Sequence, residues 1–122
     1  MKREIKISAG HIEVKAYLNE TNTAKKVWDA LPVTASANTW GDEIYFTIPV
    51  QAELENGKEL VSLGDVGYWP PGKAMCLFFG KTPISKGDEI RPASAVNIIG
   101  KIEGDLKALK KVKDGETITI RR

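Results

Sequence analysis

The sequence predicts a mainly β domain, built as a closed or nearly closed barrel with two short helices over its ends. Through most of the chain hydrophobic residues alternate with polar ones, which is the period of a strand with one buried face. Turns rich in glycine, proline and asparagine separate these runs, and only two segments show helical spacing. Because closure removes exposed sheet edges, we favour a barrel. A two-sheet sandwich has the same periodicity and stays open as the alternative.

The first predicted element is an N-terminal hairpin that turns at Ala9–Gly10. Ile5 and Ile7 alternate with charged residues before the turn, and the even-numbered positions from 12 to 18 are apolar after it. Three later runs follow the same rule: Ile44, Phe46, Ile48 and Val50; Val96, Ile98 and Ile102; and Ile118 and Ile120. The unbroken apolar run 74–79 instead predicts a strand buried on both faces, or one between a core and a pocket.

Two segments are predicted to be helical. The first, over residues 24–31, carries apolar residues at i, i+3, i+4 and i+7, which form one stripe on a helix. A side-chain oxygen from residues 21–23 can cap its start, and Pro32 ends it. In the second, Asp105 can cap a short helix over residues 106–109.

Composition predicts one folded domain over residues 1–122. Hydrophobic residues make up 42% of the chain and charged residues 28%, as in ordinary globular proteins, so we exclude disorder as the main state. Eighteen Lys and Arg against sixteen Asp and Glu give a net charge of +2. That balance predicts no nucleic-acid or membrane partner, and we interpret the lysines at 107–113 as a solvated helix end.

The scarcity of cysteine and histidine excludes several chemistries. Cys76 is the single cysteine and His11 the single histidine, so an internal disulfide, a cysteine zinc cluster and a multi-histidine metal site are excluded. We expect no metal and no cofactor. A lone cysteine and the lack of an apolar targeting segment favour the cytoplasm, where we expect a monomer or weak homo-oligomer.

No catalytic group stands out. His11 falls on the strand face opposite Ile12, which predicts a surface position. Cys76 lies within the apolar run and is expected to pack as a small hydrophobe with a raised pKa. The carboxylate pairs at 42–43 and 88–89 flank turns, and neighbours in a strand point to opposite faces, so they rarely act as an acid–base pair.

Aromatic residues gather around one stiff turn. Four of the nine aromatic residues fall in this short stretch: Tyr68, Trp69, Phe78 and Phe79. Pro70 and Pro71 fix the turn between them, and Thr82 adds a hydroxyl nearby. A rigid aromatic wall with a few polar groups is what a small-ligand or peptide pocket requires. The same rings could instead fill the end of a barrel.

A second group of candidates lies on other strands. If Phe46 faces the core, Tyr45 faces the other way. Trp40 precedes a Gly-Asp turn, where it could cover a barrel mouth or pack against the first helix. Asn97 needs partners for its amide, so it either organises a loop or contacts a ligand. The candidate wall and anchor residues are Trp40, Tyr45, Phe46, Trp69, Phe78, Phe79, Thr82 and Asn97.

Four stretches resemble the small prokaryotic cyclophilin-like proteins. They are TWGDEIYF at 39–46, GDVGYWPPG at 64–72, CLFFGKTP at 76–83 and PASAVN at 92–97. The resemblance extends over nearly the whole chain, and its Tyr-Trp-Pro-Pro-Gly with the downstream Phe-Phe-Gly is its most specific part. It implies a cyclophilin-type closed β-barrel of about eight strands with two capping helices.

What the resemblance implies about activity is weaker. True cyclophilins isomerise the peptide bond before proline, with an arginine, a glutamine beside a Phe-Phe pair, several aromatic residues and a histidine. Phe78–Phe79 is similar to that pair, but Leu77 stands where the glutamine would be. No arginine occurs at 44–46, and His11 lies far upstream. Because the guanidinium is the obvious donor to the twisted amide, we expect isomerisation to be weak or absent.

The sequence therefore predicts a barrel that binds a small molecule or a short, proline-containing peptide in an aromatic groove. No catalytic residue is assigned. One alternative is an atypical peptidyl-prolyl cis-trans isomerase. The other is an interaction subunit whose exposed aromatic surface docks a partner protein.

Overall fold

Nine strands form one antiparallel sheet in the computed structural model, which describes residues 3–122. Residues 1 and 2, which the predicted domain includes, lie outside the described residues. The strands are β1 (Arg3–Ala9), β2 (Ile12–Leu18), β3 (Val33–Ser36), β4 (Asn38–Thr39), β5 (Glu43–Thr47), β6 (Asp65–Trp69), β7 (Ala74–Phe78), β8 (Asn97–Glu103) and β9 (Thr117–Arg121). The helical elements are α1 (Asn22–Ala30) and two 3₁₀ helices, η1 (Pro70–Gly72) and η2 (Leu106–Lys111).

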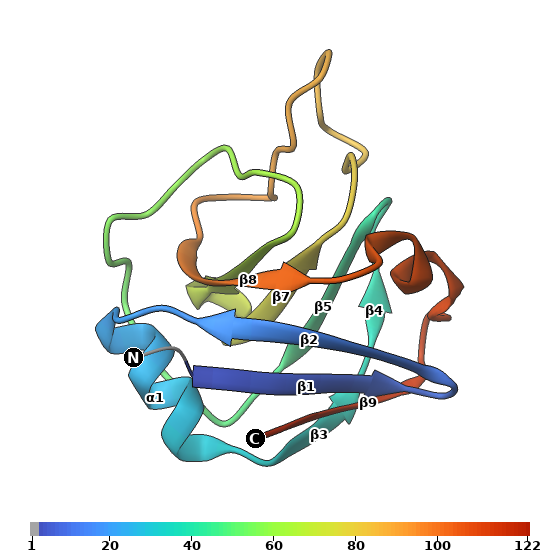
Figure 1. Cartoon of the computed structure of the whole chain (residues 1–122). Coiled ribbons are helices and arrows are strands. Elements are labelled where there is room, and N and C mark those ends of the chain that lie inside the picture. Colours follow the sequence, from blue (N-terminus) through green and yellow to red (C-terminus); the bar gives the residue numbers. More distant parts are fainter. Residues whose placement is uncertain (1–2) are drawn as a thin grey trace.

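The sheet curves into a barrel that one continuous stretch of chain closes. Its strand order is β3-β9-β1-β2-β8-β6-β7-β5-β4, so β3 and β4 stand at the two ends (Figure 1). Only Ala37 separates these two strands in the chain, and it is fully buried. Residues 33–39 thus pair with β9 at one end and with β5 at the other. Counted as one strand, they give the eight strands that the resemblance implies, in a barrel rather than a sandwich.

The predicted N-terminal hairpin and both helix caps are confirmed. In the hairpin Ile7 stands opposite Val14, and His11 is exposed in the turn between the strands. At the start of α1 the Thr21 hydroxyl accepts a hydrogen bond of 3.1 Å from the backbone N–H of Ala24. Asp105 caps the second helical segment in the same manner, but that segment is a 3₁₀ helix.

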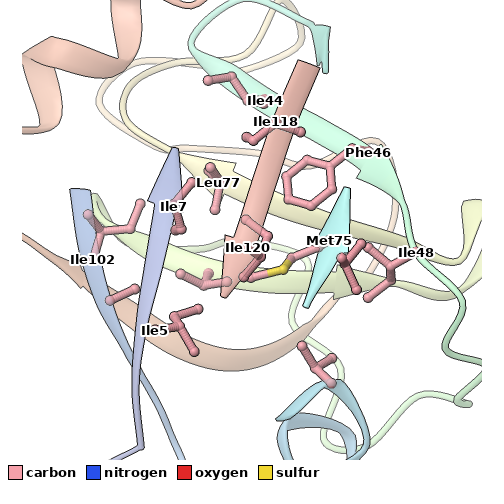
Figure 2. Packing of buried hydrophobic residues seen from close by; sticks show 14 of the residues in the cluster. Ile5, Ile7, Ile44, Phe46, Ile48, Met75, Leu77, Ile102, Ile118 and Ile120 are labelled. Atoms are coloured by element: carbon pink, nitrogen blue, oxygen red, sulfur yellow. The ribbon is translucent and has the colours of Figure 1, made fainter. Parts of the chain in front are cut away.

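The barrel interior is filled by the predicted alternating residues. Figure 2 shows Ile5 and Ile7 of β1 pointing toward Leu77 and Met75 of β7 on the opposite wall. Phe46 is fully buried among them. Burying an aromatic or branched side chain contributes about 1.5–3 kcal/mol, so this packed interior is the main source of stability.

A β-bulge makes the predicted phase of the 96–102 run wrong. In the pairing of β6 with β8, Val66 stands opposite Gly100 and the next residue, Gly67, stands opposite Ile98, so Ile99 is an extra residue. The bulge shifts the alternation by one position. Ile99 therefore packs in the barrel interior, whereas Val96 packs in a second apolar cluster outside it.

Two long connections, residues 48–64 and 80–96, extend beyond the sheet at the top of Figure 1. Tyr68 of β6 anchors the first of them. Its hydroxyl is buried, donates to the carbonyl oxygen of Val50 at 2.6 Å and accepts from the N–H of Ala52 at 3.2 Å. Burial raises the pKa of this phenol, so it stays a neutral donor.

We expect Tyr68→Phe to lower the free energy of unfolding by about 2 kcal/mol, because it leaves two buried backbone groups without a partner. Urea denaturation at neutral pH measures the loss. Tyr17→Phe is the matched control, since that hydroxyl makes a 3.3 Å bond to Glu4 in a part-buried position. An equal loss in both variants would contradict the anchoring role of Tyr68.

Candidate functional site

The outer face of β5, β6 and β7 carries a second apolar cluster. Strand alternation places Met75 and Leu77 in the barrel and Cys76 and Phe78 on the outside. The buried members of this outer cluster are Cys76, Phe78, Ile90 and Val96, with Tyr45, Val61, Trp69 and Ile98 partly buried against them. The two long connections supply Val61, Ile90 and Val96, so they cover this face.

A cavity of about 300 Å³ lies in this outer cluster. Three of its walls are aromatic: Trp40 comes from the turn before β5, Tyr45 from β5 and Trp69 from the end of β6. The other lining residues are Glu43, Pro92, Ala93 and Val96. The cavity is thus an apolar, aromatic site with one carboxyl group.

The aromatic walls are held by their neighbours. The rings of Tyr45 and Trp69 meet edge to face, with centroids 6.4 Å apart and planes at 71°. The Trp69 indole N–H donates to the hydroxyl of Ser94 at 2.6 Å, which ties β6 to the second long connection. The rings therefore form a fixed corner of the cavity.

A tight turn positions Trp40. Its backbone N–H donates to the Glu43 carbonyl at 2.9 Å, and the Glu43 N–H donates back at 3.2 Å. Gly41 in this turn has a φ of +61°, and a Cβ there would lie 2.8 Å from the Lys81 carbonyl oxygen. Only glycine avoids both the strain and the clash, so it fixes the Trp40 side of the cavity.

Glu43 is the one acidic residue that lines the cavity. Glu43 is only 5% exposed, and its Oε1 atom has no hydrogen-bond partner within the described residues. Burial raises the pKa of this carboxyl to about 7, and the nearby Cys76 thiol opposes the shift in part. Burial also raises the pKa of Cys76, as its position in the apolar run predicts, and the nearby Glu43 adds to that shift.

Of the eight candidate residues, the structure brings Trp40, Tyr45 and Trp69 together around the cavity. Phe78 is fully buried in the outer cluster but does not line the cavity. Phe46 lies in the barrel interior. Phe79 packs on the interior cluster and lines a separate hollow near Leu109 of η2.

Thr82 fastens the second long connection. Its hydroxyl donates to the backbone carbonyl of Arg91, and its N–H donates to the Ser85 hydroxyl at 3.0 Å. The Ser85 hydroxyl also accepts a hydrogen bond from the N–H of Arg91, at 3.1 Å. Thr82 thus closes the base of the loop 82–91. Pro92, which follows this loop, lines the cavity.

Asn97 fastens the first long connection. Its side-chain oxygen accepts from the N–H of Glu55 at 2.6 Å, and its amide donates to the Glu53 carbonyl at 2.8 Å and to the Thr23 hydroxyl at 3.0 Å. The Glu55 carboxylate in turn accepts from the N–H groups of Asn22 and Thr23, both at 3.0 Å. Together these bonds join the loop to the start of α1. The bonds that the Glu55 carboxylate accepts from Asn22 and Thr23 lower its pKa.

Sequence reasoning missed Glu43, because it considered the carboxylate only as half of a pair with Asp42. A usable signal was present. Glu43 and Tyr45 are two apart in a strand, so they share the face opposite Ile44 and Phe46. The burial of Glu43 depends on residues 80–96, and no local sequence pattern indicates that these residues cover β5.

Two further properties of the described residues bear on the site. Within residues 3–122, no group of three or more His, Cys, Asp or Glu side chains is arranged to hold a metal ion. No helix in the same part of the chain is long and apolar enough to cross a membrane.

Comparison with known proteins identifies the class. The cyclophilin-like family model matches the chain over residues 3–121. The chain belongs to the cyclophilin-like family. It is also similar to the hypothetical protein AF2241 from Archaeoglobus fulgidus, known from a solution structure, with 51% sequence identity and a TM-score of 0.85. That match covers 99% of this chain and 95% of AF2241. No protein with a curated description matches the chain.

Proposed function

We propose that this protein binds a small molecule, or a residue of a short, proline-containing peptide, in the cavity between Trp40, Tyr45 and Trp69. The observation that carries the proposal is the aromatic cavity itself, which holds a single buried and partly unpaired carboxyl. Ligand sites are concave, mostly apolar and supplied with a few convergent polar groups. A volume of about 300 Å³ suits a small ligand or one side chain.

The three tryptophans make the proposal directly measurable. Trp40 and Trp69 line the cavity, whereas Trp28 lies on α1, where the Arg122 guanidinium stacks 4.6 Å from its ring centre. Their indole N–H groups give three separate signals in a ¹H–¹⁵N spectrum. We expect a bound probe to shift the Trp40 and Trp69 signals in a saturable manner and to leave the Trp28 signal in place.

Three probes test the site: benzylamine, benzyl alcohol and the blocked dipeptide acetyl-Ala-Pro-methylamide. Trp69→Ala should weaken the binding of any probe that binds by at least about tenfold, because aromatic residues dominate such contacts. Trp28→Phe is the matched control and should leave binding unchanged. If no probe shifts the two cavity signals, the proposed function is wrong.

The same dipeptide tests the isomerase alternative. Catalysis would speed the exchange between its cis and trans forms, which magnetisation-exchange spectra measure without a coupled enzyme. We expect no acceleration, because Leu77 stands where true cyclophilins carry a glutamine and residues 44–46 contain no arginine to polarise the amide. Acceleration that disappears in Phe79→Ala would replace the binding function with isomerisation.

A further inference from the structure

We propose that the ligand of this cavity is an organic cation, an alkylammonium group held by the carboxylate of Glu43 and walled by Trp40, Tyr45 and Trp69. This inference rests on the proposed function and names the chemical class of its ligand. It starts from the Oε1 atom of Glu43. Buried polar groups in folded proteins nearly always have a partner, and a buried charge without one is costly. Oε1 of Glu43 has none among the described residues.

The described residues that line the cavity supply no counter-ion to this carboxyl. No lysine, arginine or histidine is among the described residues that line the cavity. The nearest arginine in sequence to the lining segment, Arg91, holds Glu89 at 2.8 Å instead. The Cys76 thiol from β7 acts on Glu43, and the Tyr45 phenol from its own strand lines the same cavity. A positive charge at Glu43 would therefore have to come from outside the chain.

The walls of the cavity suit such a charge. Aromatic rings attract ammonium groups through the negative potential over their faces, and sites for alkylammonium ligands are built from several such rings. Three rings, two from residues 40–45 and one from Trp69, converge on the cavity that Glu43 also lines. The edge-to-face pair of Tyr45 and Trp69 places two of them at a steep angle, so they border a bound group from two sides.

A neutral ligand with a carbonyl group is the competing class, and the two differ in their response to pH. A protonated Glu43 would donate a hydrogen bond to a carbonyl, so that binding would weaken as the pH rises. A cation requires the ionised carboxylate, so that its binding strengthens as the pH rises. Because the carboxyl titrates near 7, the fraction ionised increases about tenfold between about pH 6 and about pH 8.

Benzylamine and benzyl alcohol form the decisive pair, because they have nearly the same size and shape and only the amine is charged. An alkylamine stays protonated between about pH 6 and about pH 8. From the Trp40 and Trp69 shifts we expect benzylamine to bind at least about tenfold more tightly than benzyl alcohol at about pH 8. Its affinity should rise by up to about tenfold over that pH range, while that of benzyl alcohol stays constant.

Glu43→Gln keeps the shape of the side chain and removes its charge. In this variant benzylamine should lose its advantage over benzyl alcohol and its pH dependence together. Asp42→Asn is the matched control and should leave both unchanged, because that carboxylate lies in the turn before β5, 4.0 Å from Lys110, and does not line the cavity. The comparison of the two probes on the unmodified chain needs no variant, so it decides the matter even if Glu43→Gln folds poorly.

The outcomes separate the two proposals. If benzyl alcohol binds as tightly as benzylamine, or if benzylamine binding weakens as the pH rises, the cation inference is overturned and the proposed binding function stands. If neither probe nor the dipeptide shifts the cavity tryptophans, both are overturned.

Discussion

Asn97→Ala is expected to lower the free energy of unfolding by about 4 kcal/mol, the largest loss that we predict for a polar residue of this chain. Asn97 is fully buried, and its side chain makes three hydrogen bonds. Alanine leaves the N–H of Glu55, the carbonyl of Glu53 and the hydroxyl of Thr23 without this partner. Each buried group that loses its partner costs about 1–3 kcal/mol. Urea denaturation of both proteins measures the difference.

Amide hydrogen exchange should show where the loss is felt. We expect protection to fall first in residues 51–58 and at the start of α1, because Asn97 joins those two segments. Asn38→Ala is the matched control. Its amide makes one exposed bond of 3.2 Å to the Tyr45 carbonyl, and its removal should cost less than about 1 kcal/mol. Similar losses for both asparagines would show that the loop is held by other contacts.

The second large effect is a pH-dependent stability difference between the unmodified chain and Glu43→Gln. The pKa of Glu43 is about 7 in the folded protein, above its ordinary value of 4.5. The folded state therefore binds more protons than the unfolded state between these values, and stability falls as the pH rises through that window. The contribution of this one group reaches on the order of 3 kcal/mol and is fully lost above about pH 7.

Glutamine does not titrate, so Glu43→Gln should escape that loss. Relative to the unmodified chain, we expect the free energy of unfolding of the variant to rise by about 3 kcal/mol between about pH 5 and about pH 8. Urea denaturation at both pH values measures this change. Asp42→Asn, in which the half-buried neighbouring carboxyl is changed, should show no such gain. A difference between Glu43→Gln and the unmodified chain that is the same at both pH values would contradict the raised pKa.

Much of the fold follows from local sequence patterns. The hairpin of β1 and β2, the caps at Thr21 and Asp105 and the Pro70–Gly72 turn each depend on residues close together in the chain. Alternation alone also places Tyr45 on the face opposite Phe46. The pocket was less predictable. Its walls come from three stretches, residues 40–45, Trp69 and residues 92–96, and nothing local shows that they converge.

The phase error in β8 has the same origin. The extra residue Ile99 is defined by the pairing of β8 with β6, and a bulge leaves no mark in the alternation of one strand. The 3₁₀ form of η2 is a similar case, because the apolar spacing of Leu106 and Leu109 suits either helix type.

The sequence by itself determined that this is a mainly β chain with a nearly neutral charge, and its motifs identified the cyclophilin-like class. These properties depend on periodicity, turn residues and composition, which act over a few residues. Only the tertiary structure decided which aromatic side chains share a cavity and which fill the barrel. It also buried Glu43, because residues 80–96 fold over β5 from far along the chain. Long-range packing sets the dielectric around that carboxyl, and with it both its pKa and the ligand that the site can take.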